Sequence, residues 1–491
     1  MYLLAIDIGT SGCKASFVDD MMNVVDSETI NYATSFVKNG WAEQNAQDWW
    51  DGAVQAVRLL CARNAGIKIE GIGCSGHMLG MLPVDEHCLP LRPAMIHADT
   101  RAVQERMLLE KAFGAQKMYE KTGNVLSETS TLCKAMWLQK NEPETYAKAA
   151  RFLQSKDYIV AKITGNIDST DFSDASHAML IDIYSKKYLE DVFAEVGLHR
   201  QKFPALHRAI DIVGTLQPGP AAELGLVPGI PVVAGGGDGA CASVGAGAAS
   251  PGDIYLSLGT TAWIAYTQQE PIVDNPPRVF NIMSLDAESY GVFGTTQAAG
   301  RVVSWVQELF GLPSPKDVDL LAAKAPAGSN GLLFLPYIEG ERSPIFDAKA
   351  KGDYFGIGPV HKNRHFVRAA LEGTAYALRD ILSVMREKEE ITELRILGGG
   401  AKSAFWKQII ADVAEVSLAD ITASAESGTS LGAAVAAGVG IGAFKDVASA
   451  ASKIGIRSRT SPNKENAEVH RQAFTRYKKL YKQLQPLFAE A

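Results

Sequence analysis

Two glycine-threonine turns, half the chain apart, constrain the fold more than any other feature of the sequence. The first follows the apolar run Tyr2–Ile8 and contains Gly9, Thr10 and Ser11. The second follows a similar run at 255–258 and contains Gly259, Thr260 and Thr261. Apolar segments return after both turns, a pattern typical of β-hairpins. An internal duplication, with one copy in each of two lobes, explains the repeat most economically.

The length of 491 residues exceeds what one hydrophobic core usually supports, so two lobes are also expected from size. Proline and glycine at 249–252 interrupt helical and strand patterns alike, which places the boundary between lobes 1–249 and 250–491. A helical pattern at 48–63 precedes a strand pattern at 67–72, and a strand at 394–397 precedes a helix at 403–416. This alternation predicts an α/β fold in which helices cover sheets.

The composition excludes several classes of protein. Apolar residues make up 47% and charged residues 21% of the chain, as in soluble globular proteins. The net charge of −7 and the lack of a basic run argue against a nucleic-acid partner. The small-apolar run at 432–444 is shorter than a membrane span, and the first residues lack a signal-peptide pattern. Six cysteines without a C-x-x-C pair indicate reduced thiols, so we expect a cytoplasmic protein without a membrane partner. A homodimer is left open as its assembly state.

Four glycine-rich turns follow apparent strands, a set that together favours a nucleotide site. Such turns let backbone N–H groups converge on an anion, and Thr and Ser add hydroxyl donors. Glycine also serves strand-to-helix turns for geometry alone, so one turn by itself is weak support. The four turns lie at 7–12, 235–239, 257–261 and 398–403.

Two named nucleotide motifs do not fit these turns. The last turn has Ala401 directly before Lys402, where a P-loop requires glycine. The second turn matches G-x-G-x-x-A through Gly237, Gly239 and Ala242. However, no acidic residue ends an evident second strand about 20 residues later, as a dinucleotide fold requires. Neither a P-loop nor a dinucleotide fold is therefore favoured.

Asp7 and Asp238 are the two carboxylates within these turns. Phosphoryl transfer needs one acid to position Mg²⁺ and another to accept the proton of the attacking hydroxyl. Asp7 has Ser257 at the corresponding place in the second copy, so we interpret it as the metal-side residue. Asp238 opens a stretch of small residues that leaves room for a substrate hydroxyl. An ordinary helix N-cap explains Asp238 equally well at this point.

The sequence resembles the FGGY carbohydrate kinases, and the xylulokinases among them most closely. The match runs over nearly the whole chain and follows the order of the family's motifs. These motifs are Asp7-Ile8-Gly9-Thr10-Ser11, Gly40-Trp41-Ala42-Glu43-Gln44, Trp49-Trp50, Leu91-Arg92-Pro93-Ala94, Asp171-Phe172-Ser173-Asp174-Ala175-Ser176, Gly236-Gly237-Asp238, Ser257-Leu258-Gly259-Thr260, Leu335-Pro336-Tyr337, Gly340-Glu341-Arg342-Ser343-Pro344, Gly398-Gly399-Gly400, Trp406, Ala411-Asp412 and Leu431-Gly432-Ala433-Ala434.

The resemblance implies a two-lobed, duplicated fold of the actin, hexokinase and Hsp70 type (ribonuclease H-like), with ATP and a sugar meeting in a central cleft between the lobes. It implies that Asp238 is the catalytic base and that Asp7 belongs to the metal and phosphate end. The phosphate-binding residues would be those of the two hairpin turns, and Gly399 and Gly400 would lie on the adenosine side. Lys14, which follows the first turn, and Lys402, which lies within the last one, are included with the nucleotide-binding residues.

The departures from the family pattern concern the sugar. Xylulokinases usually have Ser-Gly-Gln-Met-His-Gly where this chain has His77, Met78 and Leu79 between Gly76 and Gly80. They usually have Trp-Asn-Asp-x-Arg where this chain has His97 and Asp99. Polar groups have therefore moved, and the expected aromatic wall is lost at His97. A lone histidine is often structural, so contact with substrate stays open for both histidines. We expect substrate contacts from Asp238, His77, Met78, Leu79 and Asp99.

The sequence thus predicts an ATP- and Mg²⁺-dependent kinase for a hydroxyl of a small ketose, such as the ketopentose xylulose, or of a polyol. Another substrate of the family, such as erythritol, glycerol or gluconate, is the alternative within enzymes. A non-catalytic, ATP-gated module of the same fold is the rival from a different class. The Gly-Gly-Asp sequence at 236–238 argues against that rival, because a nucleotide switch does not need it.

Overall fold

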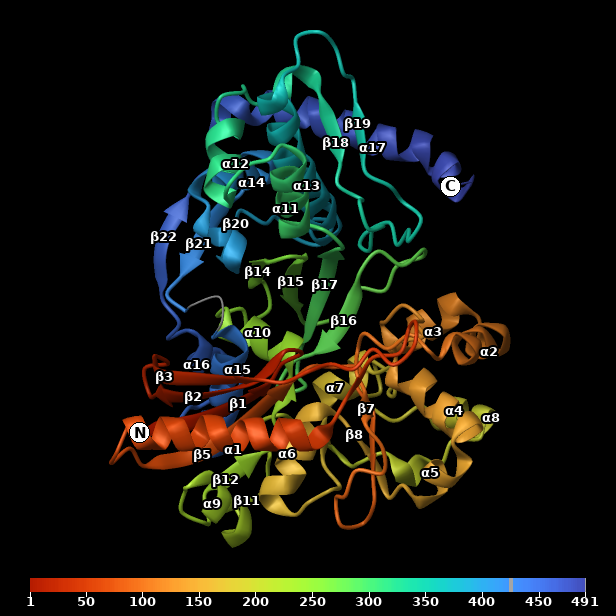
Figure 1. The fold of residues 1–491 in the computed structure, drawn as a ribbon, viewed down its shortest axis with the longest axis vertical. Coiled ribbons are helices and arrows are strands. Elements are labelled where there is room, and N and C mark those ends of the chain that lie inside the picture. Colours follow the sequence, from red (N-terminus) through yellow and green to blue (C-terminus); the bar gives the residue numbers. More distant parts are fainter. Residues whose placement is uncertain (424–426, 491) are drawn as a thin grey trace.

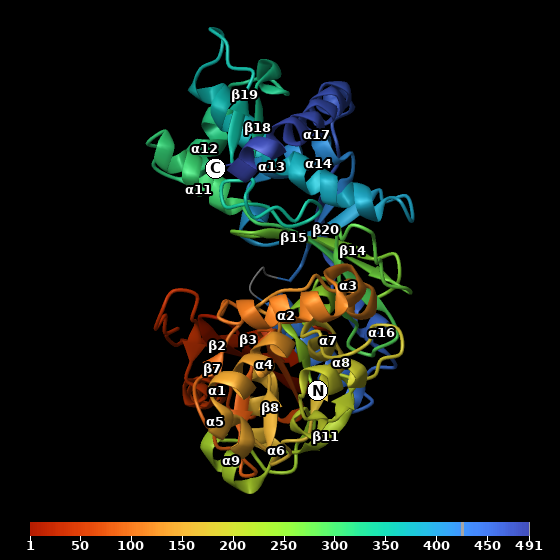
Figure 2. The ribbon, with the colours of Figure 1, turned by 90° about the vertical axis from the view of Figure 1, so that its right-hand side faces the viewer.

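The computed structural model describes residues 1–423 and 427–490 and has two lobes stacked along its long axis (Figure 1). The first half of the chain forms the lower lobe, and most of the second half forms the upper lobe. The view turned by 90° shows the same division (Figure 2). Each lobe is built around one large mixed sheet, so the expected α/β class and two-lobed architecture are confirmed.

The first sheet has the order β11-β12-β5-β1-β2-β3, and β13 also pairs with β5. Its centre is the predicted hairpin, in which β1 and β2 are antiparallel and Asp7 lies opposite Lys14. β5 runs parallel to β1 on the other side. The strands are β1 (Tyr2–Ile8), β2 (Gly12–Asp19), β3 (Val24–Asn31), β5 (Ile69–Gly76), β11 (Ile212–Thr215), β12 (Pro231–Val233) and β13 (Gly236–Gly237).

The second sheet repeats this plan with the order β16-β17-β15-β14-β20-β21-β22. β14 and β15 form the second predicted hairpin, and β20 runs parallel to β14 as β5 does to β1. The duplication inferred from the two turns is therefore present in the sheets. The strands are β14 (Ile254–Leu258), β15 (Ala262–Gln268), β16 (Phe280–Met283), β17 (Tyr290–Thr296), β20 (Glu393–Leu397), β21 (Ser417–Ile421) and β22 (Ile456–Thr460).

Two helices, α10 (Asp238–Gly245) and α15 (Gly428–Gly440), pack against each other between the sheets. One core cluster joins their small side chains, such as Cys241 and Ala434, to Leu3 of the first sheet and Tyr255 of the second. α15 comes from the second half of the chain yet packs on β1 and β5. A division at 249/250 thus separates the two sheets but leaves α15 against the first one.

Other helices cover the outer faces of the sheets. α1 (Ala46–Arg63), α6 (Ser155–Thr164) and α9 (Pro218–Leu224) pack beside the first sheet. α11 (Gly300–Leu309), α12 (Pro315–Ala322), α13 (Asn363–Met385), α14 (Ala404–Ala414) and α17 (Ala467–Glu490) share the core of the second. α16 (Val447–Ala451) packs on α15 and α10. The helices expected at 48–63 and at 403–416 correspond to α1 and α14.

The lower lobe also carries a helical region with its own core. It contains α2 (Val103–Phe113), α3 (Ala115–Thr122), α4 (Thr131–Asn141), α5 (Pro143–Lys148), α7 (Phe172–His177) and α8 (Glu190–Val196). Short strand pairs connect it to the sheet: β4 (Glu43–Gln44) with β7 (Ala94–Met95), β6 (Leu82–Val84) with β8 (Arg151–Leu153), and β9 (Thr170–Asp171) with β10 (Leu206–His207). In the upper lobe β18 (Leu333–Leu335) pairs with β19 (Asp353–Phe355).

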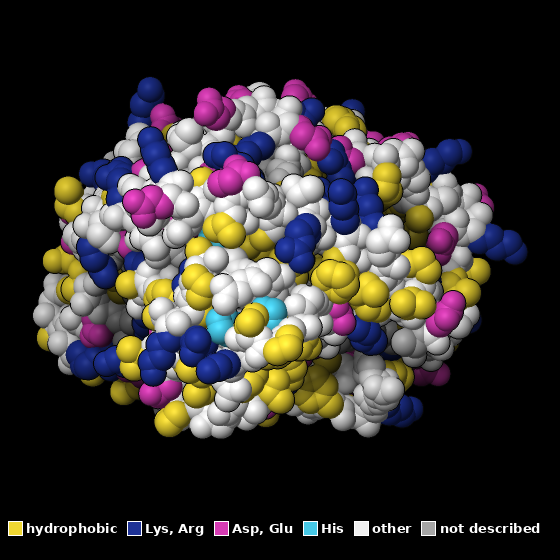
Figure 3. Space-filling view, turned by 90° about the horizontal axis from the view of Figure 1, so that it is seen from above, with side chains coloured by type: hydrophobic (Ala, Val, Ile, Leu, Met, Phe, Trp, Pro, Cys, Tyr) yellow, Lys and Arg dark blue, Asp and Glu magenta, His cyan; other side chains and the backbone are white. Residues whose placement is uncertain are grey.

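Within the described residues, no helix combines the length and apolar character that a membrane crossing requires. On the face of the upper lobe seen from above, basic and acidic side chains are interspersed with apolar ones (Figure 3). This mixed pattern agrees with the modest net charge of −7.

Candidate active site

A pocket of about 510 Å³ lies between the lobes and contains the predicted base. Its walls come from both halves of the chain, which places a cleft where the duplicated fold predicts one. Six of the expected site residues line it: Thr10, His77, Met78, Leu79, Asp238 and Thr261. The other lining residues used below are His97, His177, Phe280, Phe293, Arg342 and Thr429.

Asp238 is the first residue of α10 and points into this pocket. The N-cap of the helix is Gly237, and no side-chain capping bond is made there. Asp238 is therefore not the N-cap of this helix, contrary to the alternative interpretation. Burial, and secondly the negative charge of Asp7, raise the pKa of Asp238 to about 7. A carboxylate with such a pKa is a stronger base than an exposed aspartate.

The turn before Asp238 is held from behind by a buried polar network. The N–H of Gly237 donates to Ser173 Oγ at 2.9 Å, and Ser173 Oγ donates to Asp171 Oδ2 at 2.5 Å. Lys156 Nζ lies 3.0 Å from Asp171 Oδ1 and is completely buried. Gly235 supplies the bend, since its φ is +71° and a Cβ there would lie 2.2 Å from the carbonyl oxygen of Cys74. The Asp171–Ser176 motif thus has a structural reason: it holds the turn that carries Asp238.

Asp7 lies at the end of β1, next to the pocket. Thr429 of α15 donates a hydrogen bond to Asp7 Oδ2, while Asp7 Oδ1 is buried and has no partner among the described residues. Burial raises the pKa of Asp7, although the bond from Thr429 and the charge of Lys14 oppose this shift. An unpartnered, desolvated carboxylate oxygen is suited to bind a cation.

The two hairpin turns present hydroxyl groups at the cleft. Thr10, Ser11 and Thr260 are exposed, and Thr10 and Thr261 line the pocket. Each turn is closed by a backbone bond, from Gly9 N to Gly12 O and from Gly259 N to Thr261 O. The turns therefore share a closing bond from their first glycine, but the acceptor lies three residues further along in the first turn and two in the second.

The last glycine turn lies beside the second hairpin turn. Gly399, Gly400 and Lys402 belong to a short 3-10 helix, η3 (Gly399–Lys402), which begins two residues after Leu397 of the pocket lining. A Cβ on Gly400 would lie 2.6 Å from the side chain of Leu258, so η3 approaches the turn closely. Gly399 and Lys402 are exposed. These residues lie outside the pocket that contains Asp238.

The loop after β5 brings His77, Met78 and Leu79 into the pocket, and His97 reaches it from the loop after β7. The rings of His77 and His97 are 5.9 Å apart. Neither nitrogen of His77 has a hydrogen-bond partner among the described residues, and Nδ1 of His97 has none either. Burial, then the neighbouring His97 and Lys134, lower the pKa of His77 to about 3. Both rings are therefore neutral groups facing a pocket, with free hydrogen-bonding capacity.

Lys134 of α4 joins these two loops. Its buried ammonium donates to the carbonyl oxygens of Leu79 at 2.7 Å, Ile96 at 2.8 Å and Thr129 at 2.7 Å. Because an ammonium has three donors, these three bonds satisfy it completely. Lys134 thereby fixes the backbone beside His97 and at the end of the His77 loop.

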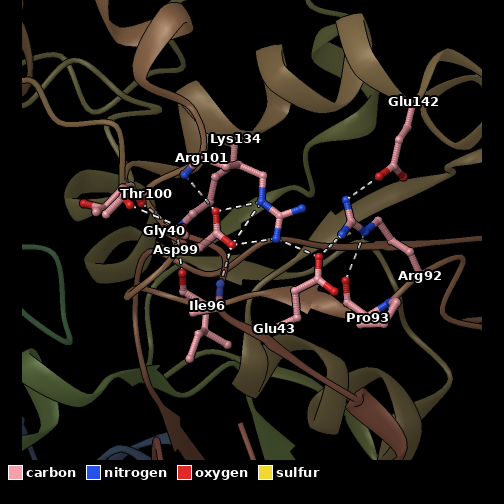
Figure 4. Close-up of polar contacts among 12 residues, drawn as sticks. Gly40, Glu43, Arg92, Pro93, Ile96, Asp99, Thr100, Arg101, Lys134 and Glu142 are labelled. Carbon is pink, nitrogen blue, oxygen red and sulfur yellow. Dashed lines mark hydrogen bonds and ion pairs between the residues drawn. The ribbon is translucent and has the colours of Figure 1, made fainter. Parts of the chain in front are cut away.

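Asp99 is completely buried and does not line the pocket. Its carboxylate accepts hydrogen bonds from the N–H of Ala42 at 2.7 Å and from Arg101 Nη2 at 2.6 Å (Figure 4). Arg101 in turn bonds Glu43 at 2.6 Å and lies over the ring of Trp41. Asp99 therefore supports the loop that carries His97, in a position away from the pocket surface.

Several pocket residues were not among the expected site residues. His177 follows the Asp171–Ser176 motif directly, and Arg342 lies inside the Gly340–Pro344 motif, so both could have been singled out by position. Phe280 and Phe293 stack on each other at 5.5 Å, and His177 stacks on Phe280 at 5.2 Å. These three rings form an aromatic wall, which no local sequence pattern predicts. Thr429 is likewise brought to Asp7 only by the tertiary fold.

Comparisons with known proteins agree with this architecture. Residues 2–245 match the N-terminal domain of the FGGY family of carbohydrate kinases, and residues 254–441 match its C-terminal domain. A xylulose kinase from Staphylococcus epidermidis is 33% identical over 99% of this chain and 98% of its own length. A xylulose kinase from Bacillus subtilis is 33% identical over 98% of this chain and 96% of its own length.

A solved structure supports the same assignment. The xylulose kinase from Rhodospirillum rubrum superposes with a TM-score of 0.92, covers 100% of both chains and is 26% identical in sequence. The two family domains, the near-complete relatives and the cleft between duplicated sheets lead to one conclusion. The chain belongs to the FGGY family of carbohydrate kinases and is a sugar kinase.

Proposed function

We propose that this protein transfers the γ-phosphoryl group of ATP to a hydroxyl of a small ketose, such as a ketopentose, or of a polyol. The observation that carries the proposal is the position of Asp238. Its carboxylate faces a pocket whose lining includes Thr10 and Thr261 of the hairpin turns and also the His77 and His97 loops. A base between a phosphate site and a polyol site is what phosphoryl transfer to an alcohol needs.

Asp238 accepts the proton of the attacking hydroxyl in this proposal. A hydroxyl has little nucleophilic character until its proton can be taken, and a positioned base typically contributes a factor of about 10² to 10⁴. The network from Lys156 through Asp171 and Ser173 to Gly237 holds the carboxylate in place. Asp99 takes a supporting role, because its oxygens are already engaged by Ala42 and Arg101.

ATP fits the nucleotide end. Thr10, Ser11, Thr260 and Thr261 offer hydroxyls on turns whose backbone can approach phosphate closely. Gly399, Gly400 and Lys402 lie next to the second turn, on the side we assign to the adenosine. Lys14 lies opposite Asp7 in the hairpin, which adds a positive charge near the phosphates.

Mg²⁺ fits Asp7, since Asp7 Oδ1 is buried without a partner. When bound, the ion would neutralise phosphate charge. Among the described residues, no cluster of three or more His, Cys, Asp or Glu side chains forms a metal cage. Asp7 would therefore hold the ion together with nucleotide oxygens and water, which is the usual mode for Mg²⁺.

A panel assay tests the proposal. ADP release is measured with MgATP and D-xylulose, D-ribulose, erythritol, glycerol, ribitol or D-gluconate as acceptor. We expect acceptor-dependent ADP release with at least one of them, and Asp238→Asn should lower its kcat by about a hundredfold or more. ATP affinity, measured by calorimetry, should change little. Binding of ATP without acceptor-dependent turnover would instead support a nucleotide-gated module, and Asp238→Asn activity within about threefold of wild type would remove Asp238 from the mechanism.

A further inference from the structure

His177 lies at the C-terminal end of α7 and lines the same pocket as His77 and His97. Its ring stacks on Phe280, which stacks on Phe293. The stacking holds the ring plane, so the direction of its two nitrogens is set. One nitrogen, Nδ1, lies 3.0 Å from Oδ1 of Asn124.

The side-chain amide of Asn124 can have only one orientation. Its Nδ2 lies 3.0 Å from the carbonyl oxygen of Thr122, 3.1 Å from that of Ser176 and 2.9 Å from that of Asn281. Carbonyl oxygens accept hydrogen bonds and cannot donate them. If the amide were turned over, Oδ1 would face three other oxygens in a buried site. Asn124 Oδ1 therefore faces His177 as an acceptor.

An acceptor opposite Nδ1 requires that Nδ1 carries the proton. Burial, and secondly the charge of Arg342, lower the pKa of His177 to about 4, so its ring is neutral near pH 7. A neutral imidazole has one protonated nitrogen and one nitrogen with a lone pair. Nε2 of His177 is consequently an acceptor without a proton.

We infer that His177 is a specificity-determining residue whose Nε2 accepts a hydrogen bond from a hydroxyl of the phosphoryl acceptor, in a tautomer imposed by Asn124. The inference deepens the proposed function and rests on it. A substrate hydroxyl can donate to Nε2, whereas a carboxylate or carbonyl oxygen would face its lone pair. Phe280 and Phe293 continue the same wall and would cover the C–H face of the bound acceptor, as aromatic rings do in sites for small molecules.

The tautomer is tested directly by nitrogen NMR on wild-type protein labelled with ¹⁵N-histidine. The chain has nine histidines, and the signal missing in His177→Phe identifies the ring. We expect a protonated Nδ1 and an unprotonated Nε2. Addition of the panel acceptor with the lowest KM should move the Nε2 resonance upfield, because a hydrogen bond withdraws density from its lone pair. A protonated Nε2, or an unchanged Nε2 resonance at saturating acceptor, overturns the inference.

Variants test the consequence for turnover. His177→Phe keeps an aromatic ring on Phe280 but removes the acceptor, so KM for the phosphoryl acceptor should rise about tenfold while KM for ATP stays within about twofold. His177→Gln can place an amide oxygen near the position of Nε2 and should recover most of the loss. His87→Phe is the matched control, because His87 is 75% exposed at the surface and should change neither constant.

The failure of this inference and that of the proposed function are distinguishable. If wild-type protein turns over no acceptor, the proposed function fails, while the tautomer of His177 can still be measured. If wild type turns over an acceptor but His177→Phe keeps its acceptor KM within about twofold, the kinase function stands and the role of His177 is refuted.

Discussion

The ammonium of Lys134 donates a hydrogen bond of 2.7 Å to the carbonyl oxygen of Leu79, a residue held at a φ of +62°. Few residues other than glycine adopt this conformation without support. Two further bonds from the same ammonium, to Ile96 and Thr129, connect the second loop and the start of α4. One side chain thus joins the segments that carry His77, Leu79 and His97.

Lys134→Met should loosen both loops at once. It removes three hydrogen bonds from buried carbonyl groups and leaves them unsatisfied, so we expect KM for the phosphoryl acceptor to rise about tenfold or more. KM for ATP should stay within about twofold, because the hairpin turns are untouched. Lys140→Met on the same helix is the control, since the Lys140 side chain is 62% exposed. A folded Lys134→Met protein with an unchanged acceptor KM would contradict the role of Lys134.

The pH dependence of the reaction follows from Asp238. Burial and the charge of Asp7 raise its pKa to about 7, so the carboxylate becomes protonated below that pH and could no longer act as the proposed base. We expect kcat/KM for the acceptor to fall about tenfold per pH unit below that pKa. A flat profile between about pH 5 and about pH 7 would exclude a general base with a pKa of about 7.

The raised pKa of Asp238 also affects the stability of the folded protein. The folded-state pKa of Asp238 lies above its ordinary value of 3.8, so the folded protein binds the proton more tightly than the unfolded chain. The contribution of this group to stability is therefore greatest at low pH and is lost as pH rises through about 7. Above that pH Asp238→Asn should unfold at a higher temperature than wild type in calorimetry, and an equal or lower temperature would argue against the shift.

The two loops that carry Leu79 and His97 predict which phosphoryl acceptor the enzyme prefers. Leu79 and His97 replace the histidine and the aromatic residue usual in xylulokinases, so D-xylulose should be a poor substrate. Another small ketose or polyol should have about tenfold higher kcat/KM, which one modest hydrogen bond can supply. The double variant His77→Gln, Leu79→His should raise D-xylulose turnover relative to the native substrate. A wild-type preference for D-xylulose over the whole panel would show that the loop changes do not set specificity.

Closure of the lobes is expected when both substrates bind. The pocket has walls from both halves of the chain, and a kinase gains from excluding water that would hydrolyse ATP. We predict that solution scattering shows a smaller radius of gyration with a non-hydrolysable ATP analogue and acceptor together than with either alone. The segment near Pro251 would act as the hinge between the lobes. Superimposable scattering curves at saturating ligands would count against closure.

The sequence alone determined the features that depend on local patterns. The predicted strand Tyr2–Ile8 is β1 with the same bounds, and both glycine-threonine turns join antiparallel strands. Asp238 is the first residue of a helix, as the glycines before it and the small residues after it indicate. Such properties follow from backbone preferences and side-chain size within a few residues, which a single stretch of sequence contains.

The tertiary structure decided which polar groups are free to act. Asp99 and Asp238 are both aspartates in family motifs, yet Asp99 is engaged by Ala42 and Arg101 whereas Asp238 faces the pocket. Asp7 meets Thr429, which is 422 residues away, and the tautomer of His177 depends on Asn124, which is 53 residues away. A side chain's availability depends on desolvation and on partners brought together by packing. Those contacts are long-range, so no local pattern in the sequence contains them.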